Sequence, residues 1–172
     1  MSLSPLKQVV LASGRRGAKL GIILYVMRGG EPRYVLVTST GRGKRRWSPP
    51  KGTIEEGETR REVAVEEAWE EAGVKIKRRQ LSAVGHYLGG RDPIVVFMAE
   101  AEEKQIKPSW PEGHERRRVI VPYDEAVRLL RGAGAKKNKW VIKALKRVQK
   151  FAEKEAAFSE APLAPKKKKK RK

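Results

Sequence analysis

Three glutamates on one predicted helix are the residues of this sequence best suited to chemistry. Glu67, Glu70 and Glu71 stand at positions i, i+3 and i+4, a spacing that places them on one helix face. Glu66 is adjacent, and Glu58 stands at the predicted helix start. Like charges on one face repel each other unless a cation sits among them, and carboxylate oxygens suit Mg²⁺ or Mn²⁺. Such a cluster can activate water and offset charge on a leaving phosphate.

A purely structural alternative is a solvated acidic helix face with Arg60 and Arg61 nearby. For an isolated Glu-Glu-x-x-Glu-Glu pattern this alternative would be the better explanation. Here the residues on both sides of the glutamates favour the catalytic interpretation, because their types and spacing also form a pattern.

The stretch from Gly52 to Val74 carries that wider pattern. Five residues separate Gly52 from Glu58, and seven more lead to the run Glu-Glu-Ala-Trp-Glu-Glu-Ala-Gly-Val at positions 66–74. The stretch resembles the Nudix box, which is a glycine, five residues, a glutamate, seven residues, then Arg-Glu-apolar-x-Glu-Glu-x-Gly-apolar. Every fixed position matches except the arginine, where this chain has Glu66.

The resemblance covers roughly residues 17–147. The segment Trp-Ser-Pro-Pro-Lys-Gly at 47–52 is similar to the opening found in Nudix enzymes that act on diphosphoinositol polyphosphates and dinucleoside polyphosphates. Membership of the family implies an α/β fold, an α/β/α sandwich around a mixed sheet in which the box forms a loop–helix–loop. It also implies hydrolysis of a diphosphate linked to another moiety, with Mg²⁺ as the cofactor and Mn²⁺ as a substitute.

Carried over residue by residue, the resemblance implies a metal site built from helix glutamates, one backbone carbonyl and one ligand from a later loop. The implied ligands are Glu67, Glu70, Glu71, the carbonyl of Lys51, and Glu115, with Glu112 in reserve. The implied catalytic group consists of Glu67, Glu70 and Glu58. In that group Glu67 is the first choice for the base, and Glu58 supports the loop and the residues that bind the metal.

The departure at Glu66 leaves two outcomes open. In the family the arginine at this position pairs with box carboxylates, whereas Glu66 removes that cation and adds a negative charge. Either another cation replaces it, with Arg61 as the candidate, and activity is kept. Or metal binding or catalysis is weakened, and the chain is a polyanion-binding protein.

Composition sets the broad class of partner. The 40 Lys and Arg against 20 Asp and Glu give a net charge of +20, which indicates a polyanionic partner. The absence of cysteine excludes disulfide scaffolds, thiolate metal sites and cysteine nucleophiles, and two histidines argue against a histidine-built zinc site. The apolar runs are short of a membrane span and the N-terminus lacks a secretory signal, so we expect a cytoplasmic protein with no membrane partner.

Basic residues around the box predict a highly phosphorylated ligand, because arginine and lysine suit clustered phosphates. The candidate substrate-binding residues are Arg15, Arg16, Lys19, Arg42, Lys44, Arg45, Arg46, Lys51 and Arg91. A diphosphoinositol polyphosphate is the first expectation for the substrate. A dinucleoside polyphosphate or an RNA 5′ end is the alternative, with the lysine-rich end of the chain as a tether for nucleic acid.

The elements that must position these residues follow from the apolar pattern. Strands are expected over 18–27, 33–38, 81–88, 94–101 and 119–121, and helices over 58–72, 122–130 and 138–151. Residues 47–52 are expected to be irregular, and the oligomeric state is left open. The chain thus divides into a basic N-terminal segment (1–16), a Nudix hydrolase domain (17–155) and a disordered Lys-rich tail (156–172).

Overall fold

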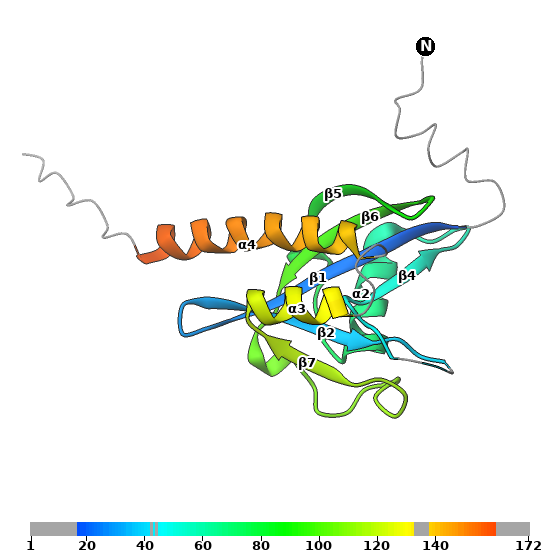
Figure 1. Ribbon diagram of the computed structural model, residues 1–172, viewed down its shortest axis with the longest axis horizontal. Helices are drawn as coiled ribbons and strands as arrows, with labels where there is room; N and C mark the ends of the chain where they lie inside the picture. Colours follow the sequence, from blue (N-terminus) through cyan, green and yellow to red (C-terminus); the bar gives the residue numbers. More distant parts are fainter. Residues whose placement is uncertain (1–16, 42, 44, 133–137, 161–172) are drawn as a thin grey trace, which may run out of the picture.

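The computed structural model describes residues 17–41, 43, 45–132 and 138–160 (Figure 1). The elements in chain order are β1 (Ala18–Arg28), β2 (Glu31–Thr38), β3 (Trp47–Ser48), β4 (Lys51–Ile54), α2 (Arg60–Ala72), the 3₁₀ turn η1 (Arg78–Gln80), β5 (Ser82–Gly89), β6 (Asp92–Glu100), the 3₁₀ turn η2 (Glu103–Gln105), β7 (Arg118–Val121), α3 (Tyr123–Gly132) and α4 (Lys139–Glu160). The predicted segment 1–16 and residues 161–172 of the tail lie outside the described residues.

The strands form one mixed sheet of seven strands in the order β3-β2-β1-β6-β5, with β4 added to β1 and β7 added to β2. The pairing of β1 with β6 is parallel, and the other pairings are antiparallel. Gly29 and Gly30 both have positive φ, the conformation that a tight turn between β1 and β2 requires.

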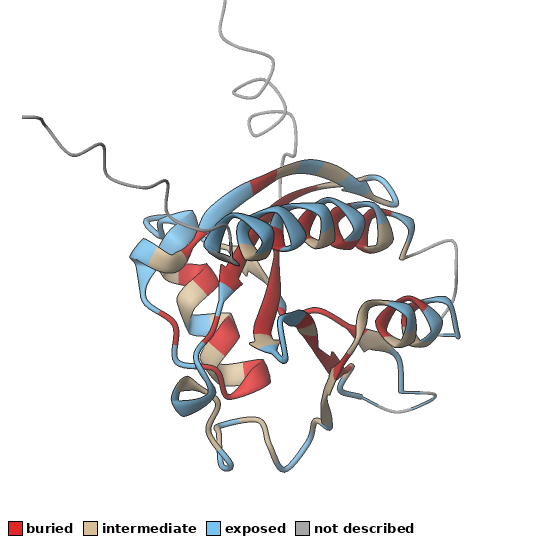
Figure 2. Ribbon diagram, turned by 90° about the vertical axis from the view of Figure 1, so that its left-hand side faces the viewer, coloured by how far each residue is buried: buried red, intermediate tan, exposed pale blue. Residues whose placement is uncertain are grey.

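Helices cover both faces of the sheet, as Figure 2 shows with the buried residues between them. β1 is apolar at consecutive positions because both of its faces are covered. Leu20, Ile22 and Leu24 belong to the core under α2, whereas Ile23 and Tyr25 belong to the core under α3 and α4. The α/β/α sandwich expected from the family resemblance is therefore confirmed.

Helix α2 begins and ends at signals visible in the sequence. Thr59 accepts a hydrogen bond from the Glu62 N–H, and the Glu62 carboxylate accepts one from the Thr59 N–H, which forms a capping box. Gly73 ends the helix at φ 67°, a left-handed conformation that favours glycine. Both ends of α2 are thus defined, and the packing of the helix on the strands determines which way its carboxylates face.

Two expectations from the sequence are wrong in detail. Residues 47–52 contribute to two short strands, β3 and β4, which Pro49 and Pro50 separate because proline cannot donate to a strand ladder. Helix α4 continues to Glu160, so residues 156–160 are helical and do not belong to the predicted disordered tail. Ala156 and Ala157 favour helix more strongly than the composition of this region suggests.

No described helix has the length and apolar character needed to cross a membrane.

The capping box predicts the effect of one substitution. Thr59→Ala removes the side-chain oxygen that accepts the Glu62 N–H, and we expect the free energy of unfolding to fall by about 1 kcal/mol. Urea denaturation measures the change, with Thr40→Ala in an exposed loop as the matched control. Equal losses in the two variants would contradict the capping role.

Candidate active site

The centre of the site is the contact between α2 and β4. Gly52 lies against the Glu67 side chain so closely that a Cβ at position 52 would overlap the carboxylate. One residue earlier, the Lys51 N–H donates a hydrogen bond of 2.9 Å to Glu71 Oε2. The box glycine is therefore required for packing, and β4 holds two of the three helix glutamates in place.

Arg116, from the segment before β7, contacts the same cluster from the other side. Its Nη2 donates to Glu71 Oε1 and its Nε donates to Glu112 Oε2. A third bond of 2.9 Å runs from Nη1 to the Thr38 carbonyl oxygen. The side chains of Arg116 and Glu71 are only 10% and 8% exposed, so this ion pair is largely removed from water.

The electrostatics of the cluster show a shortage of positive charge. Burial and the neighbouring Glu71, Glu70 and Glu112 raise the pKa of Glu67 to about 8. Burial also raises the pKa of Glu70, with Glu66 and Glu112 adding to the effect. Burial raises the pKa of Glu71 as well, against the opposing pull of the Lys51 N–H and Arg116. A carboxylate cluster in this condition gains stability from a bound cation.

The donor set fits a hard divalent cation. Glu67, Glu70 and Glu112 bring carboxylate oxygens of the kind that Mg²⁺ and Mn²⁺ prefer. Among the described residues no three acidic or histidine side chains already converge as a metal site, so binding requires the carboxylates to adjust. The Lys51 carbonyl and Glu71 stay predictions as ligands.

The structure distinguishes between the two ligand candidates from the later loop. Glu112 is bonded to Arg116, and its N–H donates to the Glu70 carbonyl at 3.1 Å. Glu115, the sequence-based first choice, is exposed and contacts His114. The reserve candidate, Glu112, is thus the one that the structure brings into the cluster.

Two further predicted positions are located by their hydrogen bonds. Glu58 accepts a bond of 2.8 Å from the Glu55 N–H, so its carboxylate closes the loop before α2, and its role in the site stays a prediction. Arg61 donates to the carbonyls of Arg78 and Leu81 and lies over the Phe97 ring. The hypothesis that Arg61 replaces the box arginine is therefore wrong, because its guanidinium is committed to other partners.

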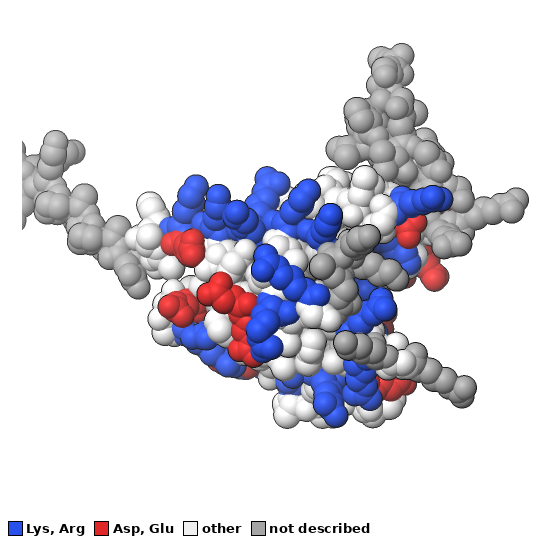
Figure 3. Space-filling view, in the orientation of Figure 1, with Lys and Arg blue, Asp and Glu red and all other residues white. Residues whose placement is uncertain are grey.

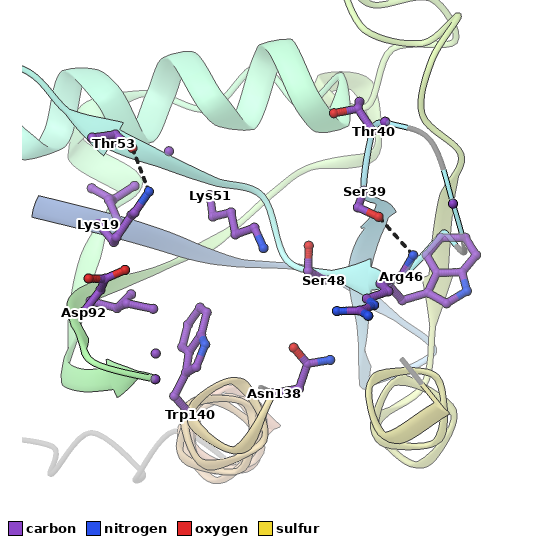
Figure 4. A pocket seen from close by; sticks show the side chains of 18 residues that line it. Lys19, Ser39, Thr40, Arg46, Ser48, Lys51, Thr53, Asp92, Asn138 and Trp140 are labelled. Atoms are coloured by element: carbon purple, nitrogen blue, oxygen red, sulfur yellow. Dashed lines mark hydrogen bonds between the residues drawn. The ribbon is translucent and has the colours of Figure 1, made fainter. Parts of the chain in front are cut away.

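A cleft of about 830 Å³ lies beside the cluster, with Lys51 and Gly52 in its wall. Figure 4 shows Lys19, Lys51 and Arg46 among the residues that line it. Lys19 Nζ donates to Thr53 Oγ1 at 3.2 Å, which places this cation on the β1–β4 side of the cleft. Three of the predicted phosphate-binding residues are thus brought together.

The remaining predicted substrate-binding residues are not brought into the cleft. Arg45 and Arg91 are exposed and do not line it. The others, Arg15, Arg16, Arg42 and Lys44, lie outside the described residues.

Sequence reasoning missed the α4 side of the cleft. Trp140 and Asn138 line it opposite Lys19 and Lys51, and Asp92 lines it from the start of β6 (Figure 4). Trp140 also packs against Gly21, where a Cβ would overlap its indole. Its place in the cleft wall depends on the packing of α4 on β1, β2 and β5, for which the sequence carries no signal.

Comparison with known proteins supports the resemblance. The NUDIX domain family model matches residues 16–145. The Escherichia coli K12 protein "Phosphatase NudJ" is 30% identical over 82 residues, which is 47% of this chain and 54% of that protein. The chain spans about half the length of the curated relatives it matches.

Two solved structures share the fold. A C. elegans Ap4A hydrolase in a binary complex aligns with a TM-score of 0.55 and 21% identity, covering 78% of this chain and 96% of that chain. A MutT structure, from work on Aliivibrio salmonicida and Vibrio cholerae, aligns with a TM-score of 0.59 and 19% identity, covering 76% and 97%.

The raised pKa of Glu67 predicts a pH-dependent stability. A carboxyl with a pKa of about 8 in the folded state, above its ordinary value of 4.5, holds its proton more tightly when folded. Its contribution to stability is therefore present at low pH and is lost as the pH rises towards 8. In metal-free buffer, Glu67→Gln is expected to unfold at a higher temperature than wild type at pH 9, with a smaller difference at pH 5. The exposed Glu56→Gln is the control, and a difference independent of pH would refute the prediction.

Proposed function

This chain belongs to the Nudix family, and on that premise we propose that it hydrolyses a phosphoanhydride bond with the help of a divalent cation. The observation that carries the proposal is the position of the carboxylate cluster. Lys51 and Gly52 line the cleft on one side and contact Glu71 and Glu67 on the other. A cation held by the cluster would stand beside a ligand in the cleft.

The roles of the residues follow from this arrangement. A bound Mg²⁺ would neutralise charge on phosphate oxygens and lower the pKa of a bound water. Glu67 is our candidate for the group that accepts a proton from the attacking water; because its pKa is about 8 without metal, it takes this role only when a nearby cation favours its ionised form. Glu70 and Glu112 would supply oxygen ligands, while Lys19, Arg46 and Lys51 would hold the phosphates.

For the substrate we propose a highly phosphorylated small molecule, with diphosphoinositol polyphosphate first. The cleft is within the size range of small-molecule sites, and its cations come from three different segments of the chain. Such a spread suits a ligand with phosphates on several sides.

A panel of substrates with Mg²⁺ tests the proposal. The panel contains a diphosphoinositol polyphosphate, a diadenosine polyphosphate, a nucleoside triphosphate and a 5′-triphosphorylated RNA. We expect turnover of at least one member and a loss of about a hundredfold or more in Glu70→Gln, because a metal ligand is removed. Glu56→Gln, in the exposed loop before α2, is the matched control. Absence of turnover with tight, salt-sensitive binding would favour the polyanion-binding alternative instead.

A second candidate, hydrolysis at the 5′ end of RNA, is favoured by the outer face of α4. Lys and Arg side chains follow that face, as Figure 3 shows along the helix. They are the exposed residues Lys139, Lys143, Lys146, Arg147, Lys150 and Lys154. Apart from the adjacent Lys146 and Arg147, they are spaced three or four residues apart, which keeps them on one side of the helix. Phe151 and Phe158 are 41% and 82% exposed on the same helix, and exposed aromatic rings can stack on bases of a single strand. The helix starts at the cleft, where Asn138 and Trp140 lie.

Charge reversal on α4 tests this second candidate. The triple variant Lys143→Glu, Arg147→Glu and Lys150→Glu is expected to bind 5′-triphosphorylated single-stranded RNA at least about tenfold more weakly, with a flatter salt dependence. Fluorescence anisotropy measures both quantities. Reversal of Lys77, Arg79 and Lys104 near η1 and η2 changes the net charge equally and serves as the control. Equal weakening in both triple variants would show that only total charge matters.

A further inference from the structure

We propose that Arg116 acts as the positioning residue that the box lacks, supplying from outside the motif the cation that Glu66 does not provide. The inference rests on the proposed function. In the family, the box arginine pairs with box carboxylates. In this chain, the ion pairs that the structure describes for Glu67, Glu70, Glu71 and Glu112 both go to Arg116.

The position of the replaced residue explains why a substitute is needed. Glu66 is exposed on α2, and its charge contributes to the raised pKa of Glu70. An arginine there would stand one helical turn before Glu70, at the i, i+4 spacing of a helical ion pair. Glu66 therefore makes the repulsion in the cluster worse, and a compensating cation must come from another element.

The segment from 107 to 118 delivers that cation because it is bonded to the end of α2. The Lys107 N–H donates to the Gly73 carbonyl at 2.8 Å, and Trp110 Nε1 donates to the Glu71 carbonyl at 3.1 Å. Arg118 Nη1 donates to the Ala72 carbonyl at 2.7 Å. These donors satisfy carbonyls that a helix end otherwise leaves without intrahelical partners. The segment is thereby fixed relative to the glutamates.

Arg116 is suited to positioning because its planar fork makes three bonds at once. Glu71, Glu112 and the Thr38 carbonyl each accept one N–H. Arginine keeps its charge when buried and binds carboxylates in a fixed geometry, which lysine cannot reproduce. With Glu71 and Glu112 held, Glu67 and Glu70 are presented to the cation that the cluster binds.

The experiment compares Arg116→Met, Arg116→Lys and the double variant Arg116→Met with Glu66→Arg. We expect Arg116→Met to lower kcat by about tenfold to a hundredfold with little change in KM, since the residue orients ligands and does not touch the substrate. Arg116→Lys should recover only part of the loss. The double variant should recover most of it, because a cation returns to the cluster. Arg117→Ala, an exposed neighbour, is the control for a single lost charge.

A second readout uses Mn²⁺ alone, followed by electron paramagnetic resonance without substrate. Removing a guanidinium that competes for carboxylates should leave Mn²⁺ affinity unchanged or higher in Arg116→Met, whereas loss of the fold would lower it. Unchanged kcat in Arg116→Met, or no recovery by Glu66→Arg in a folded protein, would overturn the inference. If Arg116→Met does not fold, wild-type kcat in Arg116→Lys would overturn it. A wild type with no turnover on any substrate would instead count against the proposed function.

Discussion

The pairing of Arg116 with the buried Glu71 and the partly exposed Glu112 is the interaction on which the geometry of the site depends. Glu67, Glu70 and Glu71 lie near the end of α2 with Glu112 beside them, and burial makes the charges of Glu67 and Glu71 costly. Removing one partner of a buried ion pair typically costs about 3–5 kcal/mol, because the other charge is left without compensation. Part of the cost of concentrating negative charge beside the cleft is thus offset inside the protein before any metal binds.

The fold and the box helix could be predicted from sequence because their signals are local. Thr59 with Glu62 and Gly73 mark the ends of α2, and the consecutive apolar residues of β1 and β2 are typical of strands with both faces covered. The Nudix spacing encodes one face of one helix, so the three glutamates could be assigned without a structure.

The partners of those glutamates could not be predicted, because they depend on contacts between distant segments. Whether Glu112 or Glu115 reaches the cluster is decided by which backbone group bonds to Glu70, and only two residues separate them. Arg61 is the arginine nearest to Glu66 in sequence, yet its guanidinium donates to carbonyls near η1. Trp140 combines packing with a place in the cleft wall, and only the fold shows the second role. In each case the sequence specifies the residue type, and the tertiary contacts select the individual residue.

The parallel pairing of β1 with β6 has a consequence for the order in which this protein acquires its cleft during synthesis. Lys19 and Leu20 of β1 form the cleft wall together with Asp92 and Ile94 of β6, which leaves the ribosome only after the whole box helix. Pairings between distant strands form late, because the intervening chain must be closed into a loop first. The β1–β2 hairpin and α2 can form earlier, but without β6 they leave one wall of the cleft absent. A nascent chain therefore carries the glutamates of the box before the cleft beside them exists, and the cleft is complete only when Asn138 and Trp140, later in the chain than β6, have joined its wall.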